Sequence, residues 1–219
     1  MPKLLCSMPN FDTVTHYLHE WSKKIVEDAK MRGFDVYPLD GPNATKQNFE
    51  SRLNKNNPKF VFLNGHGDPN MVCGHKGSDG TPQPILINNV NDGLMKNRIV
   101  YARACKSLET LGRNCVEKGA TAYIGYAERF MVLFDPVRYS RPLGDKIAES
   151  FMEISNIIPS VLVKGGTVKE AVERSFQQFL KNVEYQEAHY TSETPLILSC
   201  LIHDMAALGA IGNPDAKVT

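Results

Sequence analysis

Two residues with reactive side chains, His66 and Cys105, follow apolar segments of the sequence directly. Hydrolysis of an amide needs a nucleophile, an acid that protonates the leaving amine, and hydrogen-bond donors for the oxyanion. The thiol of Cys105 can act as the nucleophile, and the imidazole of His66 can donate a proton near neutral pH. Gly67 has no Cβ, so its backbone N–H can approach a carbonyl group closely. Together these three residues have the chemistry to cleave a peptide bond.

The segments before these residues predict how they are positioned. Residues 59–63 and 98–102 are continuous apolar runs of the kind found in buried parallel strands. Ligands bind at the carboxyl ends of such strands, and strands that follow one another in sequence are often neighbours in the sheet. We therefore expect the imidazole of His66 and the thiol of Cys105 to face each other across one crevice.

The whole chain alternates strand and helix patterns, which predicts an α/β fold around a mostly parallel sheet. No internal repeat or linker interrupts the sequence, so a single domain over residues 1–219 is expected. The expected elements are a strand over 4–8, a helix from Asp12 to Gly33, strands over 34–39 and 59–63 with a helix over 45–54 between them, a Gly- and Pro-rich insertion with two strand pieces over 68–89, a strand over 98–102, a helix over 107–118, a strand over 121–126, helices over 142–155, 168–183 and 196–205, and an edge strand over 206–211.

Composition excludes several classes of function. With 25 Lys and Arg against 24 Asp and Glu, the net charge is +1, which does not suggest a nucleic-acid binder. No apolar run approaches the roughly 20 residues that span a bilayer, so we expect no membrane partner and a cytoplasmic location. The five cysteines lack CxxC spacing, which argues against a disulfide framework or a zinc site. The chain has neither a GxGxxG motif nor a P-loop, so no cofactor and no metal are expected.

The two strand-end motifs carry a family resemblance. Phe60-Val61-Phe62-Leu63-Asn64-Gly65-His66-Gly67 and Ile99-Val100-Tyr101-Ala102-Arg103-Ala104-Cys105 resemble the strand, His-Gly and Ala-Cys pattern of the caspase-like (clan CD) cysteine peptidases. Residues 118–126 and 165–171 are most similar to the gingipain and CHAT branch. Two departures stand out: Arg103-Ala104-Cys105-Lys106-Ser107 replaces the caspase Gln-Ala-Cys-x-Gly, and Cys105 follows His66 by 39 positions rather than roughly 50.

The resemblance implies a caspase-like three-layer αβα sandwich with a flavodoxin-like start and a β-hairpin insertion. It implies a cysteine endopeptidase, with Cys105 as nucleophile, His66 as general acid and base, and the backbone N–H groups of Gly67 and Cys105 as the oxyanion hole. It implies no fixed third catalytic residue, and Asn64 and Asp68 are open candidates for orienting His66. The partners expected are a protein or peptide substrate and, as an open question, a regulatory protein.

Strand alternation suggests a specificity residue. Arg103 lies two positions before Cys105 and so on the same face of the strand, and in the resembling family this position borders the pocket for the residue before the scissile bond. Its guanidinium would bind a carboxylate, so we expect a preference for acidic residues there, with Asp68 as a second substrate-binding candidate. One alternative is that Arg103 pairs with a local acid, Glu128 or Asp135. Another is a basic-specific peptidase with an acidic pocket residue.

The ionisation state of the Cys105 thiol distinguishes a peptidase from the other functions that remain open. A helix starting near Ser107 would favour the thiolate through its dipole, and an activated thiol is expected of a peptidase. A catalytically inactive caspase-like scaffold needs no such activation. A different thiol hydrolase is also conceivable, but the sequence lacks the Gly-x-Cys-x-Gly elbow of that class.

Overall fold

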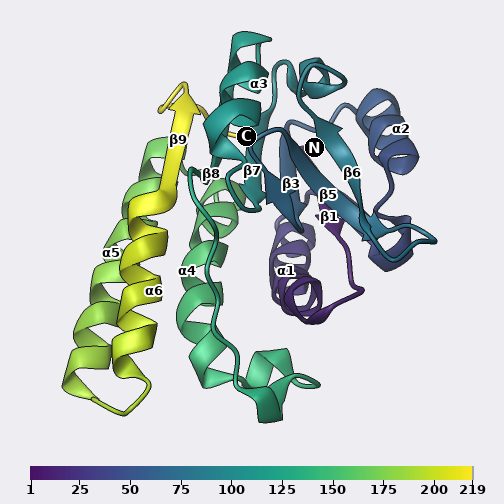
Figure 1. Ribbon diagram of the computed structural model, residues 1–219. Coiled ribbons are helices and arrows are strands. Elements are labelled where there is room, and N and C mark those ends of the chain that lie inside the picture. The colour runs from purple at the N-terminus through teal and green to yellow at the C-terminus, as the bar shows by residue number, and fades with distance from the viewer. Residues whose placement is uncertain (219) are drawn as a thin grey trace.

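The computed structural model describes residues 1–218 and is built around a six-stranded sheet (Figure 1). The strands lie in the order β2-β1-β3-β7-β8-β9. The first five are parallel and β9 pairs antiparallel to β8 at one edge. Their bounds are β1 Lys3–Met8, β2 Asp35–Asp40, β3 Phe60–Asn64, β7 Ile99–Arg103, β8 Ala122–Tyr126 and β9 Leu208–Gly212. The predicted α/β fold with a mostly parallel sheet is confirmed.

Helices cover both faces of this sheet (Figure 1). Alternate strand residues point to opposite faces, so Phe60 and Phe62 pack in one core while Val61 and Leu63 pack in the other. The first core lies under α1 (Thr13–Met31), α4 (Lys146–Val163), α5 (Val168–Ala188) and α6 (Thr194–Ala207), and the second under α2 (Lys46–Asn56) and α3 (Arg113–Glu117). Within residues 1–218, no helix combines the length and the apolar character that crossing a membrane requires.

The Gly- and Pro-rich insertion forms a small antiparallel sheet directly after His66. It consists of β4 (Gly67–Asp68), β5 (Met71–Lys76) and β6 (Pro82–Ile87). Val72 and Leu86 are fully buried in the second core. The insertion is therefore a packed part of the domain, and it carries the residue after His66 as its first strand position.

Helix α4 differs from the expected helix over 142–155. It starts at Lys146, where the side chain of Asp145 accepts hydrogen bonds from two backbone N–H groups, and it runs through Pro159 to Val163. A proline inside a helix leaves the carbonyl four residues earlier without its usual donor. That carbonyl belongs to Ser155, and the buried hydroxyl of Tyr101 donates to it at 3.0 Å. Contact with the sheet therefore compensates for the missing N–H and lets the helix continue.

Candidate active site

Neighbouring strand ends bring the His66 and Cys105 segments together. β3 and β7 are parallel, with Asn64 opposite Arg103, so His66 and Cys105 each follow a paired residue by two positions. The approach is close at Gly67, where a Cβ would lie 2.9 Å from the Cβ of Ala104 and 3.0 Å from the carbonyl oxygen of Cys105. Only glycine lets these two backbone segments touch without displacement.

The backbone N–H of Gly67 is directed away from the small sheet. Gly67 is opposite Val72, and the N–H of Cys73 donates to the carbonyl of His66 at 2.8 Å. In an antiparallel ladder, this bond marks the Gly67–Val72 pair as a non-hydrogen-bonded one, whose N–H groups point outward. The N–H of Gly67 therefore does not bond to β5 and is left for another acceptor.

The imidazole of His66 is held by Asp12, the N-cap residue of α1. Its Nε2 lies 2.6 Å from Oδ2 of Asp12. Partial burial by itself would raise the pKa of Asp12, but hydrogen bonds from His66 and from the N–H and hydroxyl of Thr15 outweigh it and lower the pKa to about 2. The carboxylate therefore stays ionised at any pH above that value. The sequence pattern predicts Asp12 only as the start of a helix, although its place just after β1 puts it at the same sheet edge.

Neither residue suggested for orienting His66 has that role. The buried amide of Asn64 accepts from Arg103 at 2.9 Å and donates to the carbonyl of Ser7 at 2.8 Å. The carboxylate of Asp68 accepts hydrogen bonds from two backbone N–H groups of the turn that follows it, at 2.7 and 3.0 Å. Asp68 is therefore engaged in turn formation, and no contact links its side chain to His66.

The predicted role of Arg103 in a substrate pocket is wrong. Its side chain is 0% exposed. Every guanidinium nitrogen donates to a neutral acceptor inside the protein: Asn64 Oδ1, Ser155 Oγ, Asn156 Oδ1, the carbonyl of Leu18 and Ser22 Oγ, at 2.7–3.1 Å. The alternative of an ion pair with Glu128 or Asp135 is wrong as well, because these acids lie beside Lys106 and Arg138.

The prediction that Arg103 and Cys105 share a face was wrong because side chains alternate only within a strand, and β7 ends at Arg103. Tyr101 and Arg103 do share one face, the face covered by α1 and α4. Cys105 lies beyond β7, and the chain turns at once, with Lys106 in the left-handed region at φ 55°. The side chain of Cys105 therefore does not continue the row in which Arg103 lies.

The thiol of Cys105 is half-buried, and the segment after β8 passes over it. The N–H of Lys106 donates to the carbonyl of Glu128 at 2.9 Å. Burial is the largest influence on the pKa of Cys105 and raises it. Asp204 raises this pKa further, whereas the N–H of Phe130 and the charge of Arg129 lower it. The expected thiolate is therefore corrected: in this conformation the thiol is protonated at neutral pH, and the helical turns after Lys106 are too short to reverse that.

Cys105 nevertheless differs from the other cysteines. Cys6, Cys73, Cys115 and Cys200 are buried, and Cys105 is the one cysteine within residues 1–218 that is not. Burial raises the pKa of Cys6 and of Cys115 to about 12 each. A reagent in solution should therefore find Cys105 first.

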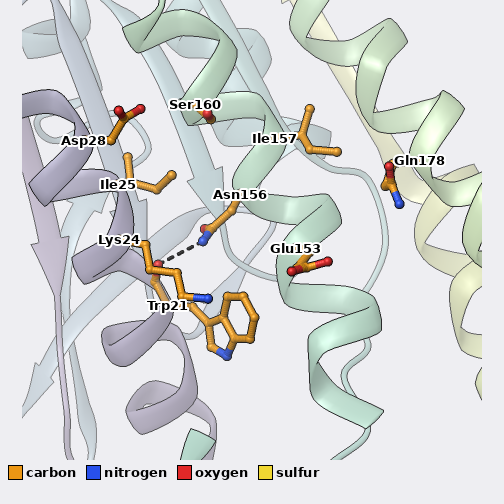
Figure 2. A pocket seen from close by; sticks show the side chains of 9 residues that line it. All are labelled: Trp21, Lys24, Ile25, Asp28, Glu153, Asn156, Ile157, Ser160 and Gln178. Atoms are coloured by element: carbon orange, nitrogen blue, oxygen red, sulfur yellow. Dashed lines mark hydrogen bonds between the residues drawn. The ribbon is translucent and has the colours of Figure 1, made fainter. Parts of the chain in front are cut away.

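A groove lies between α1 and α4 (Figure 2). Trp21 and Lys24 line it from α1, and Glu153 and Asn156 from α4. The amide of Asn156 donates to the carbonyl of Trp21 at 2.9 Å and ties the two helices together across its floor. None of the candidate catalytic residues lines this groove.

Comparison with known proteins gives a match in fold. No family model and no curated protein matches the sequence. Among solved structures, the Arg-specific cysteine proteinase gingipain R matches over 98% of this chain with a TM-score of 0.58 and 11% identity. The complex of the pro- and mature domains of RgpB from Porphyromonas gingivalis matches over 98% with a TM-score of 0.58 and 12% identity. This chain spans about half of those chains, 46% and 47%. It therefore shares the fold of gingipain R, a caspase-like cysteine peptidase of clan CD.

Proposed function

We propose that this protein is a cysteine endopeptidase with Cys105 as nucleophile and His66 as general acid and base. The observation that carries the proposal is the contact between the strand ends, where Gly67 approaches the carbonyl of Cys105 so closely that a Cβ would lie 3.0 Å from it. The fold shared with gingipain R supports the same chemistry. Cys105 is partly exposed whereas the other four cysteines are buried, and this adds to the support.

The reaction follows from the residue types. The imidazole of His66 takes the proton of the Cys105 thiol, and the thiolate so formed attacks the scissile carbonyl carbon. The N–H groups of Gly67 and Cys105 bind the oxyanion. The imidazolium of His66 protonates the leaving nitrogen as the C–N bond breaks, which leaves a thioester on Cys105. Water then attacks the thioester while His66 takes a proton from it, and the acid product leaves as the thiol is restored.

A peptide-library assay tests this proposal. Purified protein is incubated with a mixture of peptides, and cleavage products are identified by mass spectrometry. Cleavage within the peptides is expected, together with labelling of Cys105 by a peptidyl acyloxymethyl ketone. If Cys105 is labelled by neither this reagent nor iodoacetamide and no peptide is cut, the scaffold alternative holds instead.

Asp12 has a positioning role in this proposal. Its carboxylate binds Nε2 of His66 at 2.6 Å, so it sets the orientation and tautomer of the imidazole. We expect Asp12→Asn to lower kcat by roughly 10–100-fold with little change in KM, in the range found for residues that orient a catalytic or metal-bound histidine. The pH–rate profile should shift as well, because the charge beside the imidazole is lost.

A second variant separates this effect from helix capping. Asp12→Asn keeps a capping side chain, whereas Asp12→Ala removes it and should cost about 1 kcal/mol of stability in addition. Thr45→Ala removes a comparable cap from α2, where the Thr45 side chain accepts from the N–H of Asn48, and should leave the pH–rate profile unchanged. A wild-type pH–rate profile in Asp12→Asn would show that Asp12 only caps the helix.

The acidic preference now depends on a different arginine. Arg103 is buried, whereas Arg129 is exposed, close enough to Cys105 to lower the pKa of its thiol, and in no ion pair within residues 1–218. The acid near the thiol is Asp204, which is buried and whose pKa burial raises to about 8. A neutral buried acid is a poor ligand for a cationic substrate, so we propose that Arg129 favours acidic residues before the scissile bond.

Substitution of Arg129 tests this preference. Arg129→Ala should lower kcat/KM by up to about fivefold for peptides with Asp or Glu before the scissile bond, because one exposed charge contact is lost. Peptides with a neutral residue there should be cleaved at an unchanged rate. Arg138→Ala removes another exposed arginine and serves as the control. A wild-type enzyme that cuts only after Arg, the specificity described for gingipain R, or only after Lys would refute this preference.

A further inference from the structure

Residues 127–131, which follow β8, lie between the Cys105 turn and α6, and we call this segment the strap. Hydrogen bonds hold the strap to the turn on one side and to α6 on the other. The N–H of Lys106 donates to Glu128, Ala127 donates to Ala207, Nε2 of His203 donates to Arg129, and the N–H of Met131 donates to Oδ1 of Asp204, all at 2.8–2.9 Å.

The strap partly covers the thiol of Cys105. The N–H of Phe130, in the middle of the strap, faces the sulfur, and desolvation is the largest influence on the pKa of Cys105. Solvent still reaches part of this residue, which is of intermediate burial. A peptide carbonyl that is to be attacked needs fuller access to the sulfur, and that access depends on what holds the strap to α6.

Asp204 is an unusual anchor. It is 1% exposed, Oδ1 accepts from Met131, and Oδ2 has no hydrogen-bond partner within residues 1–218. Four titratable side chains face Asp204: Tyr101 in β7, Cys105 just beyond β7, Tyr126 in β8 and Cys200 in α6. His203 is its neighbour in the sequence of α6. None of these is a permanent cation, so nothing there compensates an ionised carboxylate.

We propose that Asp204 is a positioning residue that, in its protonated form, holds the strap closed over Cys105, and that release of its proton accompanies opening of the strap. The inference rests on the proposed peptidase function, for which an open strap would be the competent state. Opening gives Asp204 access to water, which solvates the carboxylate that the closed interior does not.

The sign of the pH dependence follows by linkage. In the closed state burial raises the pKa of Asp204 to about 8. An open state exposes the carboxyl group, so its pKa falls toward the ordinary value near 3.9. Between these two values the closed state binds a proton that the open state releases. Opening therefore increases with pH, by up to about tenfold per pH unit, and levels off above pH 8.

The rate of Cys105 alkylation measures this opening without any need for peptide cleavage. Iodoacetamide reacts with the thiolate, so an accessible thiol gains about tenfold in rate per pH unit below its pKa. For the wild type, the logarithm of the rate should rise by clearly more than one per pH unit between pH 5 and 8. In Asp204→Asn, which keeps an acceptor for Met131 but cannot ionise, the slope should fall to one.

Three further variants complete the design. Asp204→Ala and His203→Ala each remove one tie to the strap and should speed alkylation at pH 6 by about tenfold, the effect of one such hydrogen bond. Ile202→Ala, on the exposed side of α6, should match the wild type. The four buried cysteines report folding in the same mass spectra, since they stay unlabelled while the fold is intact.

Two results would overturn the inference. One is a wild-type slope of one per pH unit, and the other is an Asp204→Asn slope equal to a steep wild-type slope. Failure of the peptidase proposal would be seen separately, as absence of peptide cleavage in protein whose Cys105 still reacts. Should Asp204→Ala not fold, Asp204→Asn and His203→Ala still decide between these outcomes.

Discussion

Replacing Cys105 with alanine is expected to abolish peptide cleavage while the protein stays folded. Removal of a catalytic nucleophile lowers kcat by a factor on the order of 10⁴ or more. Stability should change by less than about 1 kcal/mol, because the lost sulfur lies half-exposed in a turn beyond β7 and leaves little cavity. The measurement is kcat/KM on the best library peptide, together with the thermal unfolding midpoint.

Cys115→Ala is the matched control. Cys115 is fully buried on α3, so its loss should cost stability without affecting the reaction. The two variants should therefore show opposite patterns, one inactive and stable, the other active and less stable. Cleavage by Cys105→Ala at the wild-type rate would assign the activity to another group or to a contaminant.

Replacing Gly67 with alanine should have the second-largest effect. The new Cβ would lie 2.9 Å from the Cβ of Ala104, 3.0 Å from the carbonyl oxygen of Cys105 and 3.1 Å from that of Met71, so the chain must shift. A shift of this strand end moves one proposed oxyanion donor out of place. We expect kcat to fall by roughly 10²–10³-fold, the effect of losing such a donor, with a smaller change in KM.

Gly93→Ala is the control for the added methyl group. A Cβ at Gly93 meets nothing within 4 Å, so this variant should keep both activity and stability. Loss of stability in Gly67→Ala, measured by urea unfolding, would reveal how much of the defect is structural. A Gly67→Ala protein with wild-type kcat would exclude the N–H of Gly67 from the oxyanion hole.

Local sequence pattern was sufficient for the fold. The apolar runs over 59–63 and 98–102 became β3 and β7, and the helices predicted from Asp12 and over 168–183 became α1 and α5. Capping boxes at Asp12 and Thr167 begin these two helices. These features depend on residues close together in sequence, where periodicity and capping chemistry act directly. The helix that ran past its predicted end, α4, is informative, because its continuation through Pro159 relies on the hydroxyl of Tyr101 from another element.

Contacts across the fold decided the surroundings of the candidate site. Arg103 was placed in a substrate pocket by alternation, yet its acceptors come from α1, β3 and α4, and no local pattern shows that these elements converge on one guanidinium. In the same way, the partner of His66 is Asp12, 54 positions earlier. The strap beside Cys105 is held by α6, about 100 positions later than Cys105. A strand pattern specifies which residues face inward. The hydrogen-bond partner of each buried polar group depends instead on how distant elements pack. Packing removes water from these groups, so each buried donor must then bond to an acceptor within the protein.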